Sequence, residues 1–79
     1  MKVYVVTYKS EGFDEDSSEV LAAGMHEPCL KVYLKTFRDI ANTYEDVQYV
    51  EEVEGNTKKV TFHIGDKTET LKLLEFGNE

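Results

Sequence analysis

The sequence has a single cysteine, Cys29, so no disulfide can form within the chain, and a reducing compartment is expected. It also has no apolar run near the roughly 20 residues that a transmembrane helix requires, and no membrane association is expected. The start, MKVYVVTYKSEGF, has no small-residue cleavage site and alternates like a strand. We therefore predict that it belongs to the fold and is not a signal peptide.

Basic residues are few: nine Lys and Arg stand against sixteen Asp and Glu, for a net charge of −7. Such a surface repels phosphates, so direct binding of DNA or RNA is not expected. A protein partner with a basic surface is favoured instead, although a net charge of this size also serves solubility alone. There is no glycine-rich phosphate loop, nucleophile elbow or paired metal motif, and we expect neither an enzyme nor a cofactor.

Three residues remain as candidates for catalysis or metal binding: Cys29, His26 and His63. Cys29 is predicted in the first turn of a helix, where the dipole activates a thiol, and His26 is three residues away as a candidate base. No third, orienting group is evident, and Cys29 also lies at the edge of an apolar arc, which favours a small core residue. A zinc site made of the three residues lacks a fourth ligand.

The 79 residues are predicted to form one domain, residues 1–79, that begins with two strands. KVYVVTYK (2–9) is rich in Val and Tyr and apolar on both sides, which is typical of an interior strand. EVLAA (19–23) reads as a short antiparallel partner of this strand, or alternatively as a turn of helix. Three further strands, 46–54, 58–64 and 67–76, are separated by Gly55-Asn56 and Gly65-Asp66, which suit type II′ hairpin turns.

One helix is predicted from Pro28 to residue 42 or 43. Proline suits the first helical turn, where its missing N–H costs nothing. At about 100° per residue, an arc of about 120° is apolar and contains Cys29, Leu30, Tyr33, Leu34, Phe37, Ile40, Ala41 and Tyr44. The opposite side carries Lys31, Lys35, Arg38 and Asn42 and is predicted to be a solvated face.

The two tight turns fix the register of the last three strands. Tyr49 is then opposite Phe62, and Glu52 forms an attractive cross-strand pair with Lys59. One face of this meander is apolar and comprises Val47, Tyr49, Val53, Val60, Phe62, Ile64, Leu71 and Leu73. The predicted fold is a two-layer α+β domain of order β-β-α-β-β-β, with one amphipathic helix packed on an antiparallel sheet.

One helix covers one face of a sheet, so apolar side chains are left over on the other face. We predict that Val3 and Val5 lie under the helix. The far face would then hold Tyr4, Val6 and Tyr8 together with Val50, Leu74 and Phe76. A patch of this kind marks a protein–protein surface or a homodimer interface. The alternative is that the acidic loop folds back over it.

The loop EGFDEDSSE, residues 11–19, combines five acids with one aromatic residue, Phe13. An aromatic ring in a charged collar is typical of interfaces, so Phe13 is predicted to anchor either in a partner or in the protein's own core. Calcium binding is disfavoured, because Glu19 and Met25 occupy the positions of the required Gly and bidentate Glu. The predicted partner-binding residues are Glu11, Phe13, Asp14, Glu15, Asp16 and Glu19, with Tyr4 and Tyr8 as a second patch.

The start MKVYVVTY, the segment EGFDEDSSE, the single helix and the short meander with glycine turns together resemble small proteins of bacteriophages and prophages, including anti-CRISPR proteins. The resemblance covers the whole length as an architecture and carries over no functional residues. It implies an inhibitor that binds a basic or nucleic-acid-handling protein in the cytoplasm of a bacterial host, in some cases by presenting carboxylates where DNA phosphates lie. Because Lys31, Lys35 and Arg38 interrupt any long run of negative charge on the helix, a negative surface that mimics DNA would have to combine the 11–19 loop with Glu45, Asp46, Glu51, Glu52 and Glu54. The alternative function is an oligomeric structural or regulatory protein that dimerises through the aromatic sheet face.

Overall fold

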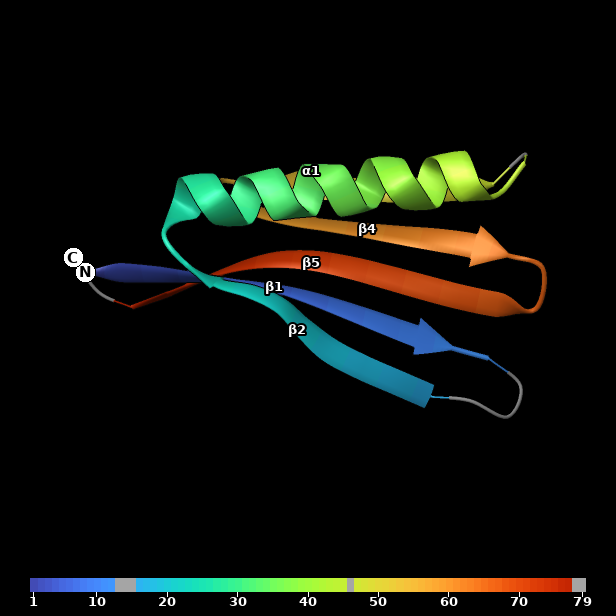
Figure 1. Ribbon diagram of the computed structural model, residues 1–79, viewed down its shortest axis with the longest axis horizontal. Coiled ribbons are helices and arrows are strands. Elements are labelled where there is room, and N and C mark those ends of the chain that lie inside the picture. Colours follow the sequence, from blue (N-terminus) through green and yellow to red (C-terminus); the bar gives the residue numbers. More distant parts are fainter. Residues whose placement is uncertain (13–15, 46, 78–79) are drawn as a thin grey trace.

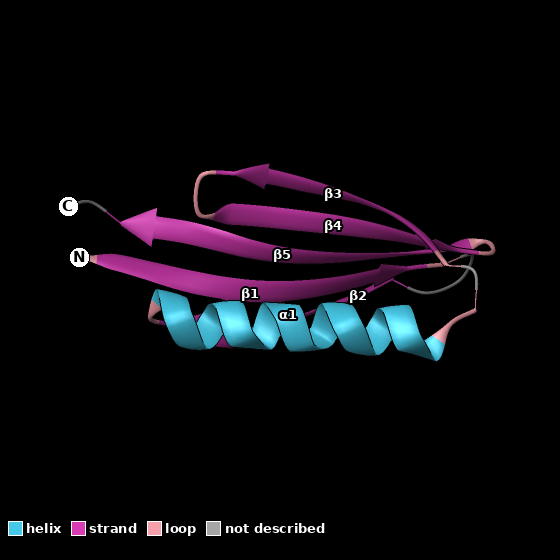
Figure 2. Ribbon diagram, turned by 90° about the horizontal axis from the view of Figure 1, so that it is seen from above, coloured by secondary structure: helices cyan, strands magenta, loops and turns pink. Residues whose placement is uncertain are grey.

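The computed structural model describes residues 1–12, 16–45 and 47–77, which form two layers (Figure 1). The sheet is antiparallel, with the order β2-β1-β5-β4-β3. Its strands are β1 (Lys2–Glu11), β2 (Asp16–Gly24), β3 (Gln48–Glu54), β4 (Thr57–Ile64) and β5 (Lys67–Gly77). Within the described residues one helix, α1 (His26–Thr43), packs on one face of this sheet (Figure 2). The predicted fold class and element order are confirmed.

The N-terminal hairpin is longer than predicted. β1 pairs with both β2 and β5 and is therefore an interior strand, as its apolar composition indicates. β2 begins at Asp16 rather than at Glu19, because Ser17 and Ser18 continue the ladder beside β1. Between Val6 and Thr7 the register shifts by one residue, which is a β-bulge in the hairpin.

Both hairpin turns of the meander have the predicted positions. Gly55 and Gly65 have φ of 61° and 60°, which a first central residue of a primed turn requires and which glycine adopts without strain. The resulting register places Tyr49 opposite Phe62 and Glu52 opposite Lys59, as expected. The local turn chemistry therefore sets the pairing of all three strands.

Helix α1 starts two residues before Pro28, which still leaves the proline in the first turn. Its buried side chains are Cys29, Tyr33 and Ile40, and they face the sheet as the apolar arc predicts. In Figure 2 the helix lies over the β1–β2 side of the sheet, and β3 is at the opposite side, where Phe37 and Tyr33 of the helix contact Tyr49 and Glu51. No helix in the described part of the chain is both long and apolar enough to cross a membrane.

The face assignment predicted for β1 is wrong. Tyr4 is only 7% exposed and Val6 is fully buried, and both lie under the helix in the core with Leu71, Leu73, Val60 and Phe62. Tyr8 packs against the same core. The reason is the pairing with β5, which places Val6 opposite Leu73 and Tyr8 opposite Leu71. Because directly opposite residues share a face, Val3 and Val5 point to the other side.

Candidate functional site

The face of the sheet that points away from α1, here called the open face, has no covering element among the described residues. At one corner Val3 lies opposite Phe76 and Val5 lies opposite Leu74. We call these four residues the apolar corner. Phe76 is 53% exposed, and Val3 is exposed to a similar degree. Exposed apolar side chains are therefore present on the far face, as predicted, but β1 contributes Val3 and Val5 to it and not Tyr4, Val6 and Tyr8.

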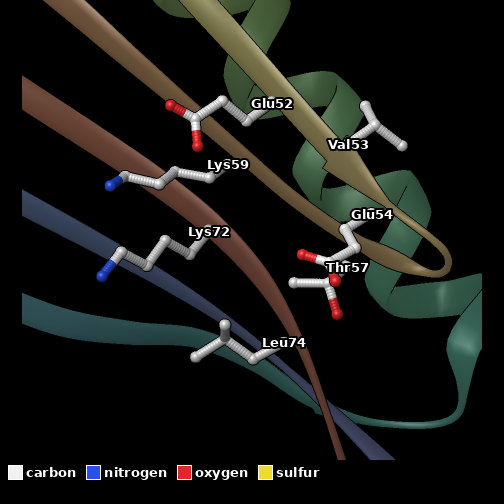
Figure 3. Close-up of a pocket in the computed structure, with 7 residues that line it drawn as sticks. All are labelled: Glu52, Val53, Glu54, Thr57, Lys59, Lys72 and Leu74. Carbon is white, nitrogen blue, oxygen red and sulfur yellow. The ribbon is translucent and has the colours of Figure 1, made fainter.

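Two lysines lie side by side next to the apolar corner (Figure 3). Lys59 and Lys72 are direct cross-strand neighbours, and their side chains extend in the same direction. They line a shallow hollow of about 440 Å³ together with Glu52, Val53, Glu54, Thr57 and Leu74. Neither lysine forms an ion pair with another described residue, although Glu52 lies directly opposite Lys59. The open face thus holds two neighbouring ammonium groups that can receive an anion.

Carboxylates flank the lysines at both edges of the open face. Glu52 and Glu54 lie on β3, whereas Glu11 and Asp16 face each other at the far end of the β1–β2 hairpin. Measured across the strands, Asp16 on β2 is about 19 Å from β3, and Glu11 on β1 is about 14 Å from it. Lysines occupy the strands between them, so the acidic residues do not form one continuous negative surface on this face.

The structure places the predicted partner-binding residues in three different situations. Phe13, Asp14 and Glu15 lie outside the described residues. Glu11, Asp16 and Glu19 are exposed on the hairpin, as a contact surface requires. The second predicted patch does not form from Tyr4 and Tyr8, because the helix covers the side of β1 on which they lie.

The covered face contains polar contacts that the sequence analysis missed. Tyr8 donates a hydrogen bond of 2.6 Å to Glu69, which is only 2% exposed. Tyr4 donates one of 2.8 Å to Glu75, and Tyr33 donates one of 3.1 Å to Glu51 (distances between heavy atoms). The rings of Tyr4 and Tyr8 from β1 and of Tyr33 from α1 thus lie between the helix and the sheet, and each hydroxyl donates to a carboxylate.

These contacts change the proton affinity of the groups involved. The pKa of Tyr8 and of Tyr33 is raised well above the ordinary 10.0, first because burial disfavours the phenolate and second because the hydroxyl donates to a carboxylate. The pKa of Glu75 is lowered, chiefly because its carboxylate accepts the hydrogen bond from Tyr4. A signal for these pairs was present, since Glu69 and Glu75 alternate in step with the core residues of β5.

Cys29, His26 and His63 lie in three different environments. Cys29 is 1% exposed, and its thiol donates to the backbone carbonyl of Tyr4 at 3.5 Å. The His26 ring packs on the Tyr4 ring with 4.8 Å between centroids, whereas His63 is exposed on the open face. In the described part of the chain no three His, Cys, Asp or Glu residues gather closely enough to hold a metal ion. Cys29 is therefore a small core residue, which is one of the two alternatives given by the sequence.

Three surfaces remain on which a functional site can be placed: the open face, the exposed strand β3 and the acidic end of the β1–β2 hairpin. They differ in charge, and among the described residues both the open face and the β3 edge combine charged with exposed apolar side chains. Comparisons with protein-family models, with curated proteins and with solved structures found no match for this chain.

Proposed function

We propose that the protein is a non-enzymatic interaction module that binds a partner protein with a basic surface. The observation that carries the proposal is the one-sided sheet, whose open face exposes the apolar corner and has carboxylates toward its edges, at Glu52 and Glu54 on β3 and at Glu11 and Asp16 on the hairpin. In protein interfaces a small apolar cluster supplies most of the binding energy, and surrounding charges steer the encounter. The apolar corner has the composition of such an anchor.

A basic partner is favoured by the overall charge. The net charge is −7, and three exposed carboxylates lie on the hairpin: Glu11 and Asp16 on the open face beyond the apolar corner, and Glu19 on the opposite side of the sheet. A negative field of this kind raises the association rate with a basic surface and lowers it with nucleic acid. Association is therefore expected to weaken as the salt concentration rises.

Inhibition is the mode of action that the resemblance to phage proteins implies. A protein that handles nucleic acid has a basic groove for phosphates, and an acidic module that occupies the groove competes with the natural ligand. Within this proposal, the partner is thus a nucleic-acid-handling protein of a bacterial host. The acidic residues act through competition and not through chemistry.

A homodimer through the open face is the second candidate. The apolar corner favours it, since the same cluster is present on every copy and can pack against itself about a two-fold axis. Two copies that each carry a net charge of −7 repel one another, which ranks this candidate below a basic partner.

The test is affinity capture of partners from a bacterial lysate, followed by measurement of the purified complex with three variants. Phe76→Ser is expected to weaken binding at least tenfold through the dissociation rate. Replacement of Glu11, Asp16 and Glu19 by Gln is expected to slow association and to reduce its salt dependence. Lys35→Gln, on the outer side of α1, is the matched control and is expected to change neither.

Two results would contradict the proposal. One is an affinity that responds to neither Phe76→Ser nor the triple Gln variant. The other is a stable dimer in analytical ultracentrifugation that Phe76→Ser dissociates. This result would show that the apolar corner is a homodimer interface.

A further inference from the structure

The two edges of the sheet are protected to very different degrees. At one edge, β2 contains the bulge opposite Val6 and Thr7, and its Leu21 and Ala22 pack against the core. Bulges and covering elements are the usual means of preventing an edge from pairing with a further strand. At the other edge, β3 pairs regularly with β4 over all seven residues, and each of these residues is exposed. The outward backbone groups of β3 have no strand partner among the described residues.

On its helix-facing side, β3 is bordered by apolar side chains that the helix does not cover. Tyr49 and Val53 are 49% and 57% exposed. Phe37 of α1 touches Tyr49 with 5.1 Å between ring centroids, and half-exposed Leu34 lies one turn earlier on the same side of the helix. Leu34, Tyr49 and Val53 thus form an apolar border along the edge strand.

On its open-face side, β3 carries Glu52 and Glu54, two residues apart and both exposed. Neither forms an ion pair with another described residue. The edge strand therefore offers three things to a neighbour. These are a regular row of backbone hydrogen-bonding groups, an apolar border on one side that is interrupted by Glu51, whose carboxylate accepts from Tyr33, and two carboxylates on the other side.

We propose that the β3 edge is the docking site for an extended, basic segment of the partner, which adds to the sheet as a sixth strand. This inference rests on the proposed function and deepens it. Backbone hydrogen bonds to β3 would supply affinity, and side chains on alternate sides would supply specificity. Residues facing the apolar border would be apolar, and those opposite Glu52 and Glu54 would be Lys or Arg.

Charge also decides against a second copy of this chain as the occupant. Antiparallel pairing of two β3 strands about a two-fold axis would gather Glu51, Glu52 and Glu54 of both copies in one short ladder. Like charges opposite one another destabilise a strand pair, whereas a basic strand turns the same carboxylates into attractive partners. The acids at this edge therefore keep copies apart and select for basic segments.

The predicted binding segment has the pattern basic–apolar–basic opposite Glu54, Val53 and Glu52. The probe is a synthetic seven-residue peptide with lysines at these two positions and valine or threonine elsewhere. One control peptide has the same composition with the lysines moved to the apolar side. A second control carries N-methyl groups on the amides that would face β3 and therefore cannot complete the ladder.

Binding is measured by NMR titration of the isotope-labelled full chain together with amide hydrogen exchange. We expect the outward amides of β3, and no others in the sheet, to gain at least tenfold protection. Both control peptides are expected to bind at least tenfold more weakly. Replacement Glu52→Lys with Glu54→Lys should abolish binding of the lysine peptide and confer binding of a glutamate version. Because both positions are exposed, these substitutions leave the core intact.

Three outcomes overturn the docking proposal: binding that tolerates N-methylation, binding that ignores the charge reversal, or protection that appears away from β3. The proposed function has separate outcomes. If a basic partner protein binds in a way that depends on Phe76 but not on Glu52 and Glu54, the edge proposal fails and the proposed function stands. If the peptide docks on β3 while no basic protein binds the full chain, the edge proposal stands and the proposed function fails.

Discussion

The two faces of this sheet treat their polar groups in opposite ways. On the covered face each buried hydroxyl or carboxylate is partnered, and no buried side-chain nitrogen or oxygen in the described residues lacks a hydrogen bond. On the open face Lys59 and Lys72 lie side by side without an ion pair to a described residue, and the same face carries the exposed ring of Phe76. The comparison predicts that most of the stability comes from the helix-facing layer, which contains the buried core, and that substitutions on the open face cost little.

The largest contrast is expected from two phenylalanines on opposite faces. Phe62 is fully buried under α1, and Phe62→Ala should lower the free energy of unfolding by about 3–5 kcal/mol through lost burial and the cavity left behind. Phe76→Ala on the open face should lower it by less than about 1 kcal/mol. Urea unfolding of both variants measures the difference. Equal losses would show that the open face is covered in solution.

A smaller contrast is expected from two glutamates. Glu69 accepts hydrogen bonds from Tyr8 and Tyr44 and forms an ion pair with Lys67 at 3.1 Å while almost fully buried. Glu69→Gln should lower the free energy of unfolding by about 1–3 kcal/mol, because a charge-assisted buried network is broken. Glu52→Gln on the open face should change it by no more than about 0.5 kcal/mol. A comparable loss at both positions in thermal and urea unfolding would contradict the contrast.

The covered face should also make the protein sensitive to alkali. The raised pKa of Tyr8 and of Tyr33 means that the folded protein keeps protons which the unfolded chain releases above pH 10.0. Their contribution to stability is therefore complete below pH 10.0 and is lost as the pH rises beyond it. Tyr8→Phe should flatten this decline, as unfolding curves collected across the alkaline range would show. An unchanged slope would mean that the phenol titrates normally in the folded state.

The smallest effect is a gain on the open face. Lys59 and Lys72 are like charges directly opposite one another, which destabilises a strand pair. Lys72→Glu should therefore raise the free energy of unfolding by about 0.2–1 kcal/mol at low ionic strength, and the gain should shrink as salt is added. Lys35→Glu on the helix surface makes the same change in net charge and is the control. A gain of equal size in the control would assign the effect to overall charge.

Most of the fold could be predicted because its determinants are local. Gly55 and Gly65 mark the two turns, and turn geometry with alternating side chains leaves one register for the meander. The helix follows from its 3.6-residue period and from Pro28 near its start. The side of β1 that faces the helix could not be predicted in the same way. KVYVVTYK is apolar on both sides, so only its pairing with β5 decides between them.

The candidate site was predicted in part. The surplus of apolar residues follows from counting faces, and Leu74, Phe76 and Val50 do lie on the open face. The residues of β1 that join them there could not be predicted, because the strand is apolar on both sides. Val3 and Val5 were therefore wrongly predicted under the helix, and Tyr4 and Tyr8 on the open face. The missed tyrosine–glutamate contacts join residues far apart in the sequence. The alternation of Glu69 and Glu75 with the core residues of β5 indicates the face on which they lie, but it does not indicate which tyrosines they contact.

The strand order has a consequence for biosynthesis. The central pair of the sheet joins its first and fifth strands, and the hydrogen bond from Tyr4 to Glu75 spans 71 positions. Until β5 leaves the ribosome, β1 has no strand to pair with on that side, and Leu71 and Leu73 are missing from the core. The hairpin and the helix therefore cannot form the complete core before then. Contacts this distant slow folding relative to helical proteins of similar size, and uncovered strands of a growing chain are exposed to chaperones and to aggregation. We therefore expect this domain to reach its native state only after β5 has been synthesised.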